Sequence, residues 1–561
     1  MEDKEEYSEN MKNNNISKVL FFTLVLVFFT QFSFFSNSVS QTVEIWPIIY
    51  AKDNDAANGI RLSQTSYWTV DNKYYNYGNL YFRISNTLER FNPLNKSTSN
   101  NNLFSEESDK NHHFTLMYVS LLSIYGISFL FSFLITKNIN QILISMILIN
   151  TIFMTNKYWM SKIFGVHPDL LLCFFICLGM FLSIKLISNK VKKDEIITEE
   201  ENYKDNSKKN KNILVILSGF VWGLALSVKL SALFFLPALA LLFLPLKKEE
   251  IKENISDSIK FFSTLFITYF ISGFPQNFEF VALYNFIKYQ SAYSIAPTSE
   301  SFNEWWELLY NQYIIFLPFI FLLVAFFSEK NENEVKITNI IKIFVLSFVP
   351  FCFLLSRNIT SPHEHYTLPV VTAFIIFTTF LLINLKKYLI NKEIIHFKTN
   401  SNIFIPITLI ISLLIIKYIP NAVSKEYDAN LVCKEEAKTL YNMVKSFQIN
   451  KLKTHVDPYV PFNAQLGWIK NSWFKTFDDI VPNEADVLVL SKKYYSRYTS
   501  SKEATHYIKQ DTKNFDKIKE FYTLFENKDK VTDKYGQDWE KVFFDNCGWE
   551  VWKRKILLKS Q

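Results

Sequence analysis

The sequence predicts an α-helical polytopic membrane protein with about 11 transmembrane helices and a small C-terminal α/β domain. Three observations predict this fold class. Apolar residues make up 49% of the 561-residue chain and collect in runs, each of about 17–23 residues, the length that crosses a hydrocarbon core as a helix. Lysine-dense segments lie between alternate runs, as in short cytoplasmic loops. After residue 420 the apolar runs stop and polar sequence continues.

The apolar runs predict the positions of the membrane spans. They lie near residues 17–37, 114–136, 139–155, 169–189, 212–228, 230–246, 260–275, 311–328, 340–356, 365–385 and 402–419. The first has no small-residue cleavage site after it, which favours a retained signal anchor over a cleaved signal peptide. The fifth and sixth form one stretch interrupted only by Lys229. At about 1.5 Å per residue this stretch is too long for one crossing, so it predicts two helices folded at Lys229.

Lysine placement predicts the orientation of the spans. Three basic segments and the N-terminal tail, 1–16, fall on one side if eleven spans are present: "NKVKKDEIITEEENYKDNSKKNKN" (189–212), "KKEEIKEN" (247–254) and "KKYLINKEIIHFK" (386–398). That side is predicted to be cytoplasmic. The outward segments are then 38–113, 156–168, 276–310, 357–364 and everything after 420. The net charge of +7 reflects this topology, so we expect a lipid bilayer and no nucleic acid as partner.

The C-terminal region, 420–561, has a different pattern from the transmembrane domain, 17–419. Residues 434–447 are amphipathic with a helical period, whereas 486–495 and 549–555 have the pattern of strands. These elements predict an extracytoplasmic α/β domain. Cys433 and Cys547 bracket the domain, and in an oxidising compartment they form either a disulfide or two free thiols. Cys173, Cys177 and Cys352 lie in predicted spans, where a cysteine acts as a small apolar residue.

The longest outward segment, 38–113, contains the first candidate site. Asp53 and Asp55 begin "DNDAANGIRLSQ", Arg61 follows, and Tyr77 belongs to a tyrosine-rich stretch. One interpretation is a solvated loop with an aromatic belt at the headgroup level. The functional interpretation is a site for a lipid-linked ligand, with Asp53 or Asp55 as the acid.

Two further ionisable residues lie at the predicted outer membrane face. Asp169 follows Pro168 at the start of the fourth span, where it either stabilises the helix N-terminus or takes part in a site. Lys229 lies at the outer turn, where it either extends to the interface or binds a lipid phosphate.

A short loop before the tenth span adds Arg357, His363 and His365. Arg357 is a second candidate phosphate clamp. The two histidines are two residues apart, which on a strand would point them to one side. They are candidates for a sugar or phosphate contact, with a metal as the weaker alternative.

The order of these segments resembles that of polytopic glycosyltransferases of the GT-C superfamily that use polyprenyl-phosphate sugars. Glycosyltransferase family 39, the protein O-mannosyltransferases and the aminoarabinose transferases belong to it. The matching segments are "DNDAANGIRLSQ" (53–64), "NYGNLYF" (76–82), "HPDLLLCFFICLGMFL" (167–182), "SGFVWGLALSVKLSALFFLPAL" (218–239) and "RNITSPHEHYTLPVVTAF" (357–374). The chain has no Walker, GxGxxG or G-x-S-x-G motif, which disfavours soluble-nucleotide chemistry.

The resemblance implies a mechanism. By its interval to Arg61, Asp55 corresponds best to the catalytic base, and Asp53 is the competing choice. The substrate-binding residues implied are Arg61, Tyr77, Asp169, Lys229, Arg357, His363, His365 and Tyr366, the last from the "YTLP" helix start. A carboxylate would deprotonate an acceptor hydroxyl while Lys229 and Arg357 stabilise the departing lipid phosphate. The partners implied are a polyprenyl-phosphate sugar and a glycan, lipid or protein acceptor.

One departure from these relatives bears on metal dependence. Asp53-Asn54-Asp55 is closer to the Asp-x-Asp of metal-dependent oligosaccharyltransferases than to the usual Asp-Glu. No cofactor is certain, and a divalent metal held by Asp53, Asp55 and Asp169 stays an open alternative.

Two other functions stay open at this point. One is a lipid-glycan flippase or transporter, and the other is a membrane scaffold with an exported binding domain. The predicted location in every case is a bacterial inner membrane or an ER-type membrane.

Overall fold

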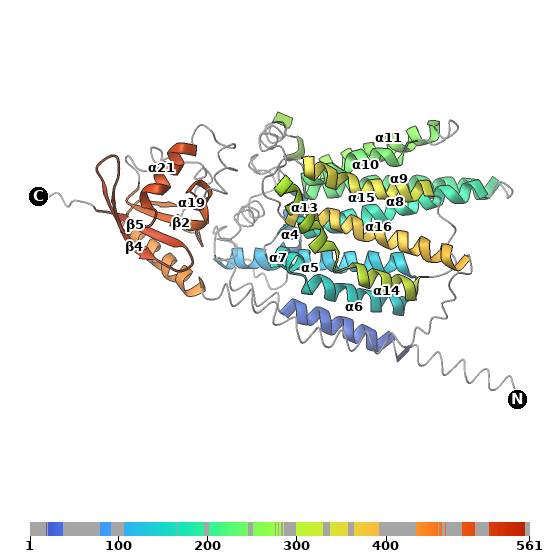
Figure 1. Cartoon of the computed structure of the whole chain (residues 1–561), viewed down its shortest axis with the longest axis horizontal. Helices are drawn as coiled ribbons and strands as arrows, with labels where there is room; N and C mark the ends of the chain where they lie inside the picture. The colour runs from blue at the N-terminus through green and yellow to red at the C-terminus, as the bar shows by residue number, and fades with distance from the viewer. Residues whose placement is uncertain are drawn as a thin grey trace, which may run out of the picture.

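The computed structural model has two parts, a helical bundle and a sheet domain, which lie end to end along the longest axis (Figure 1). It describes residues 18–19, 21–37, 79–90, 106–164, 167–195, 201–244, 251–274, 276–278, 280–281, 284, 299–328, 337–356, 364–391, 433–457, 459–462, 466, 485–499 and 515–555. Most of these residues are helical. All structural statements below concern this part of the chain.

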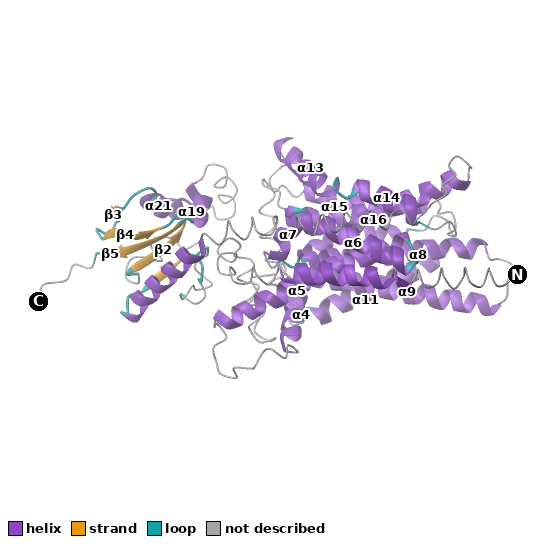
Figure 2. Ribbon diagram, turned by 90° about the horizontal axis from the view of Figure 1, so that it is seen from below, coloured by secondary structure: helices purple, strands orange, loops and turns teal. Residues whose placement is uncertain are grey.

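The helices of the bundle lie side by side along the long axis (Figures 1 and 2). They are Phe21–Asn37, α4 (Asn79–Arg90), α5 (Glu106–Ile135), α6 (Ile139–Thr155), α7 (Lys157–Phe164), α8 (Asp169–Glu195), α9 (Glu201–Val228), the 3₁₀ helix η2 (Leu230–Phe235), α10 (Leu236–Leu242), α11 (Ile251–Ser272), the 3₁₀ helix η4 (Gln276–Phe278), α13 (Ser299–Tyr313), α14 (Leu317–Phe327), α15 (Ile337–Ser356) and α16 (Glu364–Asn391).

Six helical segments of the described chain are long and apolar enough to cross a membrane. They are His113–Ile135, Asp169–Ile187, Lys209–Val228, Phe302–Phe327, Ile337–Ser356 and Tyr366–Asn391. Shorter apolar helices match the predicted spans 17–37, 139–155 and 230–246. The predicted span 260–275 overlaps α11, which is not among the six, and 402–419 lies outside the described residues. The membrane character is therefore supported, while the count of eleven spans stays a prediction.

The predicted break at Lys229 is confirmed. Lys229 has extended backbone angles, φ −159° and ψ 133°, between the end of α9 and the start of η2. Pro237 then stands in the first turn of α10, where its missing N–H costs no hydrogen bond. This break leaves the Lys229 side chain at the end of α9.

The first helix, Phe21–Asn37, is part of the packed bundle. Leu24 and Phe35 are buried, and the buried Gln31 amide donates to the Ile147 carbonyl at 3.2 Å and to Thr151 Oγ1 at 2.8 Å on α6. Hydrogen bonds of this kind hold helices together where water is absent. These contacts join the first helix to α6, and its retention as a signal anchor stays a prediction.

The helices α9 and α11 approach each other closely along a stripe of small residues. A Cβ added at Gly223 would lie 2.5 Å from the Leu265 carbonyl oxygen, and Gly219 is similarly tight against Phe261. One turn further along, Ser227 Oγ donates to the Tyr269 carbonyl at 3.2 Å. Small residues at this four-residue spacing let two helix backbones touch in a membrane.

Replacing Gly223 with Leu should force α9 and α11 apart. The atom nearest to the added side chain is a backbone oxygen of α11, which does not rotate away as a side chain does. Such overpacking typically lowers the stability by about 1–3 kcal/mol or more. The expected result is a lower melting temperature of the detergent-solubilised protein, measured by tryptophan fluorescence. Leu217→Ala is the matched control on the exposed face of α9, and an equal loss of stability there would contradict the assignment.

The sheet domain has three layers. Its five strands are β1 (Thr454–Val456), β2 (Val487–Ser491), β3 (Lys530–Thr532), β4 (Asp538–Phe544) and β5 (Trp549–Arg554), in the order β1-β2-β5-β4-β3. Only β1 and β2 are parallel; the other neighbours are antiparallel. Helix 433–449 covers one face, and α19 (Lys492–Thr499) and α21 (Phe515–Phe525) cover the other, as Figure 2 shows.

The predicted elements of this domain are largely confirmed. The helix predicted at 434–447 spans 433–449, and the last strand is β5. The strand predicted at 486–495 is wrong in its second half, since β2 ends at Ser491 and α19 begins at Lys492. The change occurs because Tyr494, Tyr495 and Tyr498 all lie buried, and this spacing fits one face of a helix.

Cys433 and Cys547 form a disulfide, with their Cα atoms 5.9 Å apart and 114 residues apart in sequence. The bond joins the start of helix 433–449 to the turn between β4 and β5. The sequence left a disulfide and two free thiols equally open, and the structure favours the disulfide.

Replacing Cys547 with Ser should destabilise the sheet domain. Closing a loop of this length restricts the unfolded chain, and loss of such a bond typically costs about 2–5 kcal/mol. The expected result is a lower unfolding temperature of the sheet domain, measured by the fluorescence of its tryptophans. Cys352→Ser, at an exposed free thiol, is the control and should leave the transition unchanged.

Asp545 should make the stability of the sheet domain depend on pH. Burial and the nearby Glu436 charge raise the pKa of Asp545 to about 6, against 3.8 ordinarily. A group with a raised pKa adds stability below its unfolded pKa and loses that stability as the pH rises through its folded pKa. We therefore expect the domain to lose about 1–2 kcal/mol between pH 4 and pH 7.

Asp545→Asn should remove this pH dependence. The substitution keeps the Oδ1 atom that accepts hydrogen bonds from the Cys547 and Trp549 N–H groups, each at 2.9 Å, and it removes the charge. Denaturant unfolding at pH 4, 5.5 and 7 would measure the slope. An unchanged slope in this variant would assign the pH dependence to another group, and exposed Asp516→Asn is the control.

Candidate functional site

A buried ion pair lies where two helices of the bundle end. Asp169 is the first residue of α8, and Lys229 directly follows α9. Lys229 Nζ donates to Asp169 Oδ1 at 2.6 Å, and the two side chains are 5% and 0% exposed. The helix α7, which ends at Phe164 shortly before Asp169, lies at the end of the bundle nearer the sheet domain (Figure 1).

Local structure explains why each charge is placed there. Asp169 stands in the first turn of α8, where unpaired N–H groups favour a carboxylate. The extended backbone at Lys229 ends α9 and lets its side chain meet a residue 60 positions earlier. A buried charge without its partner is strongly destabilising, so each residue makes the other tolerable.

His167 extends this pair. Its Nδ1 lies 3.4 Å from Asp169 Oδ2, the oxygen that faces away from Lys229, and His167 is itself buried. The carboxylate is therefore bordered by the ammonium on one oxygen and by an imidazole on the other. Asp169 Oδ2 itself accepts no hydrogen bond within the described part of the chain.

An aromatic side chain covers the ammonium from the start of α16. The Tyr366 ring centre lies 5.5 Å from Lys229 Nζ, a distance at which a cation is attracted to a ring face. Tyr366 also lies beside the buried Trp305 of α13, with ring centres 6.4 Å apart. Next along α16, Thr367 Oγ1 donates to Gln312 Oε1 at 2.8 Å, which ties α16 to α13.

The short helix α4 packs beside the ion pair. Tyr81 on α4 is fully buried; its hydroxyl donates to the Leu116 carbonyl at 3.2 Å and lies 3.3 Å from Ser120 Oγ. Burial and the negative charge of Asp169 raise the pKa of Tyr81 above its usual value, so its hydroxyl keeps its proton. Arg83 donates to the Ser272 carbonyl at the end of α11, 3.0 Å away. These contacts join α4 to α5 and α11.

The structure brings three of the predicted site residues together: Asp169, Lys229 and Tyr366. His365 belongs to the first turn of α16, and its side chain lies outside the description. The other predicted site residues, Asp53, Asp55, Arg61, Tyr77, Arg357 and His363, also lie outside the described residues.

Two alternatives raised by the sequence can be judged here. Extension of Lys229 toward the interface as a solvated cation is wrong, because the residue is buried and paired. The helix-start interpretation of Asp169 holds, but it is incomplete since the same carboxylate binds Lys229. Both results have the same cause, because the start of α8 and the end of α9 lie together and bring Asp169 to Lys229.

Sequence reasoning missed His167, Tyr81, Gln312 and Thr367 as neighbours of the site. His167 had a signal, since it stands two residues before Asp169 in "HPD". Tyr81 and Thr367 lie in the segments "NYGNLYF" and "YTLP" quoted above, whereas no local pattern marks Gln312 on α13.

The chain was compared with models of known protein families and with curated proteins. No family model and no curated protein matches it.

Proposed function

We propose that this chain is a membrane glycosyltransferase that moves a sugar from a polyprenyl-phosphate donor to an acceptor hydroxyl on the extracytoplasmic face. The observation that carries the proposal is the buried Asp169–Lys229 pair covered by Tyr366. In this mechanism the Lys229 ammonium, which the structure pairs with Asp169, would also contact the donor phosphate. The lysine-dense segments near the opposite end of α8 favour this face as the outer one.

The proposed reaction is a single displacement at the sugar C1 carbon. Asp55, with Asp53 as the competing residue, removes the proton from the acceptor hydroxyl as its oxygen attacks C1. The bond from C1 to the phosphate oxygen breaks, and Lys229 with Arg357 stabilises the charge on the departing phosphate. Asp169 acts on the reaction through Lys229 by holding its ammonium in place.

We assign Asp169 the role of a partner for Lys229 and not that of a metal ligand. Lys229 Nζ occupies one of its oxygens at 2.6 Å, and a divalent ion beside this ammonium would be repelled. A divalent metal held by Asp53, Asp55 and Asp169 stays the alternative that a metal assay would test.

The test is incubation of the purified protein with a panel of radiolabelled polyprenyl-phosphate sugars, with and without EDTA. Hydrolysis or transfer of one donor would support the proposal, and the EDTA arm reports on metal dependence. Binding of donors without hydrolysis or transfer would favour a flippase, and no binding of any donor would favour a scaffold.

A further inference from the structure

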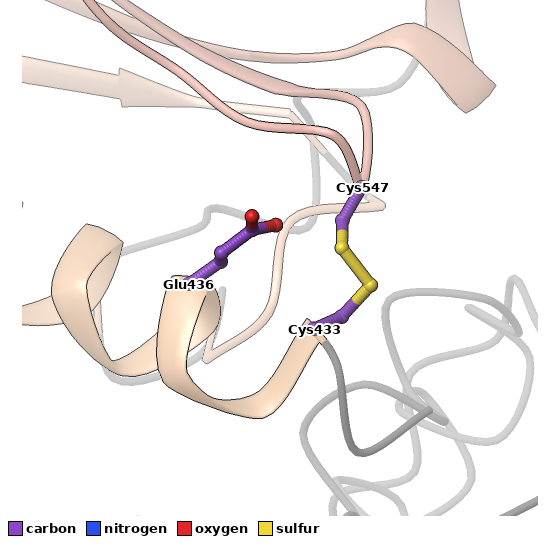
Figure 3. A group of neighbouring side chains, drawn as sticks. All are labelled: Cys433, Glu436 and Cys547. Carbon is purple, nitrogen blue, oxygen red and sulfur yellow. A yellow bond between two sulfur atoms is a disulfide. The ribbon is translucent and has the colours of Figure 1, made fainter. Parts of the chain in front are cut away.

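A second group of reactive side chains lies in the sheet domain, away from the bundle site. The sulfur atoms of Cys433 and Cys547 and a carboxylate oxygen of Glu436 all lie within 4.8 Å of one another. Figure 3 shows Glu436 one turn along the helix from Cys433, with its carboxylate on the same side as the disulfide. All three residues are half-buried, so solvent and ions reach them.

The positions of the two cysteines do not depend on the bond between them. Helix 433–449 is fixed to the sheet by the buried residues Ala437, Leu440 and Val444. The turn that carries Cys547 is held by Asp545, whose Oδ1 accepts the N–H groups of Cys547 and Trp549 at 2.9 Å each. After reduction the two sulfurs therefore stay close to each other and to Glu436.

The carboxylates beside the disulfide have buried oxygens without hydrogen-bond donors. Glu436 Oε2 and Asp545 Oδ2 accept no hydrogen bond within the described part of the chain. Asp545 is 5% exposed. Two neighbouring acceptors of this kind favour a cation between or beside them.

We propose that reduction of the Cys433–Cys547 disulfide converts this group into a Zn²⁺ site. Its protein ligands are the two thiolates and the Glu436 carboxylate, water fills the fourth position, and Asp545 adds negative charge from the adjacent turn. A dithiol reductant gives up two electrons and two protons, forms its own disulfide and leaves two cysteine thiols. Zn²⁺ then displaces both thiol protons as it binds.

The geometry suits zinc. Zinc binds sulfur at about 2.3 Å and carboxylate oxygen at about 2.0–2.2 Å in tetrahedral sites, which places ligand atoms roughly 3.5–3.8 Å apart. The Glu436 oxygen lies within 4.8 Å of both sulfurs, and the two sulfurs, now joined by a bond, must move apart to this separation after reduction. Thiolates prefer zinc to magnesium or calcium. The disulfide and the metal are then alternative ways to join helix 433–449 to the β4–β5 turn.

The experiment uses the full-length protein in detergent. One sample stays oxidised, and the other is reduced with a phosphine, which leaves no thiol in solution to compete for metal. Each receives ZnCl₂ and is desalted, and bound zinc is counted by mass spectrometry. CoCl₂ replaces zinc in a parallel arm, because a thiolate-to-cobalt absorption band reports sulfur ligands directly.

The expected result is one zinc per chain in the reduced sample, none in the oxidised sample, and a cobalt–thiolate band only after reduction. Glu436→Gln should weaken zinc binding at least tenfold, while Glu435→Gln, at the exposed neighbour, should bind as the wild type does. Zinc should also raise the unfolding temperature of the reduced protein alone.

Three results would overturn the proposal. They are equal zinc in the two redox states, equal binding by the Cys433→Ser/Cys547→Ser variant, and wild-type affinity in Glu436→Gln. The double cysteine variant also separates this site from the free thiols of the bundle, which it retains. Folding of each sample is checked by tryptophan fluorescence, so loss of binding through unfolding is recognised.

Discussion

Replacing Lys229 with Met should abolish sugar transfer and destabilise the bundle. The substitution leaves the Asp169 carboxylate buried without its ammonium, a loss that typically costs about 3–5 kcal/mol. It also removes the charge proposed to stabilise the departing phosphate, which is worth about 10²–10³-fold in rate. Transfer of a labelled donor and the melting temperature in detergent measure the two effects.

A double variant separates stability from chemistry. In Lys229→Met/Asp169→Asn both charges are gone, so most of the lost stability should return while transfer stays absent. Lys185→Met, at an exposed lysine of α8, controls for the loss of one lysine and should change neither quantity. Restored transfer in the double variant would exclude Lys229 from phosphate binding. Stability that stays as low as in Lys229→Met would show that the pair is not energetically coupled.

Asp55→Asn should reduce sugar transfer by at least about 10²–10⁴-fold, the usual contribution of a general base. The amide keeps nearly the same shape as the carboxylate but does not accept the proton of the acceptor hydroxyl. Donor binding should persist, because Lys229 and Arg357 are unchanged, and the protein should still insert and fold. Single-turnover assays with donor and acceptor measure the rate of transfer, and a separate binding assay measures the affinity for the donor.

Asp53→Asn is the matched control for the base. If Asp55 is the base, the Asp53 variant should retain most of its transfer, and exchange of the two results would assign the role to Asp53. Equal loss in both, reversed by added divalent metal, would instead indicate that the two carboxylates hold a metal together. Full activity in Asp55→Asn would remove this residue from the chemistry.

The fold illustrates which features a single sequence carries. Runs of apolar residues predicted helices, and the helix break at Lys229 and helix 433–449 lie where the pattern placed them. The strand prediction fails at 492–495 for a local reason, since buried tyrosines beside β2 resemble a continuing strand. The hydrophobic pattern identifies buried positions. A short apolar segment is compatible with either a strand or a helix.

The candidate site shows more clearly which contacts a single sequence does not reveal. Asp169 and Lys229 each stood out as ionisable residues at a predicted membrane face, and each had a simple local explanation. Their contact at 2.6 Å spans 60 residues of sequence, and no local periodicity encodes it. Tyr366, which covers the pair, comes from still further along the chain.

The sequence by itself determined the helical, membrane-type composition, the separate C-terminal domain and the residues capable of carrying charge. These follow from hydrophobic length, period and residue type, which are local properties. The tertiary structure alone decided that Asp169 meets Lys229, that Cys433 bonds Cys547 and that α9 touches α11 through Gly219 and Gly223. Such contacts depend on how distant elements pack, because close packing selects one partner among many chemically suitable ones.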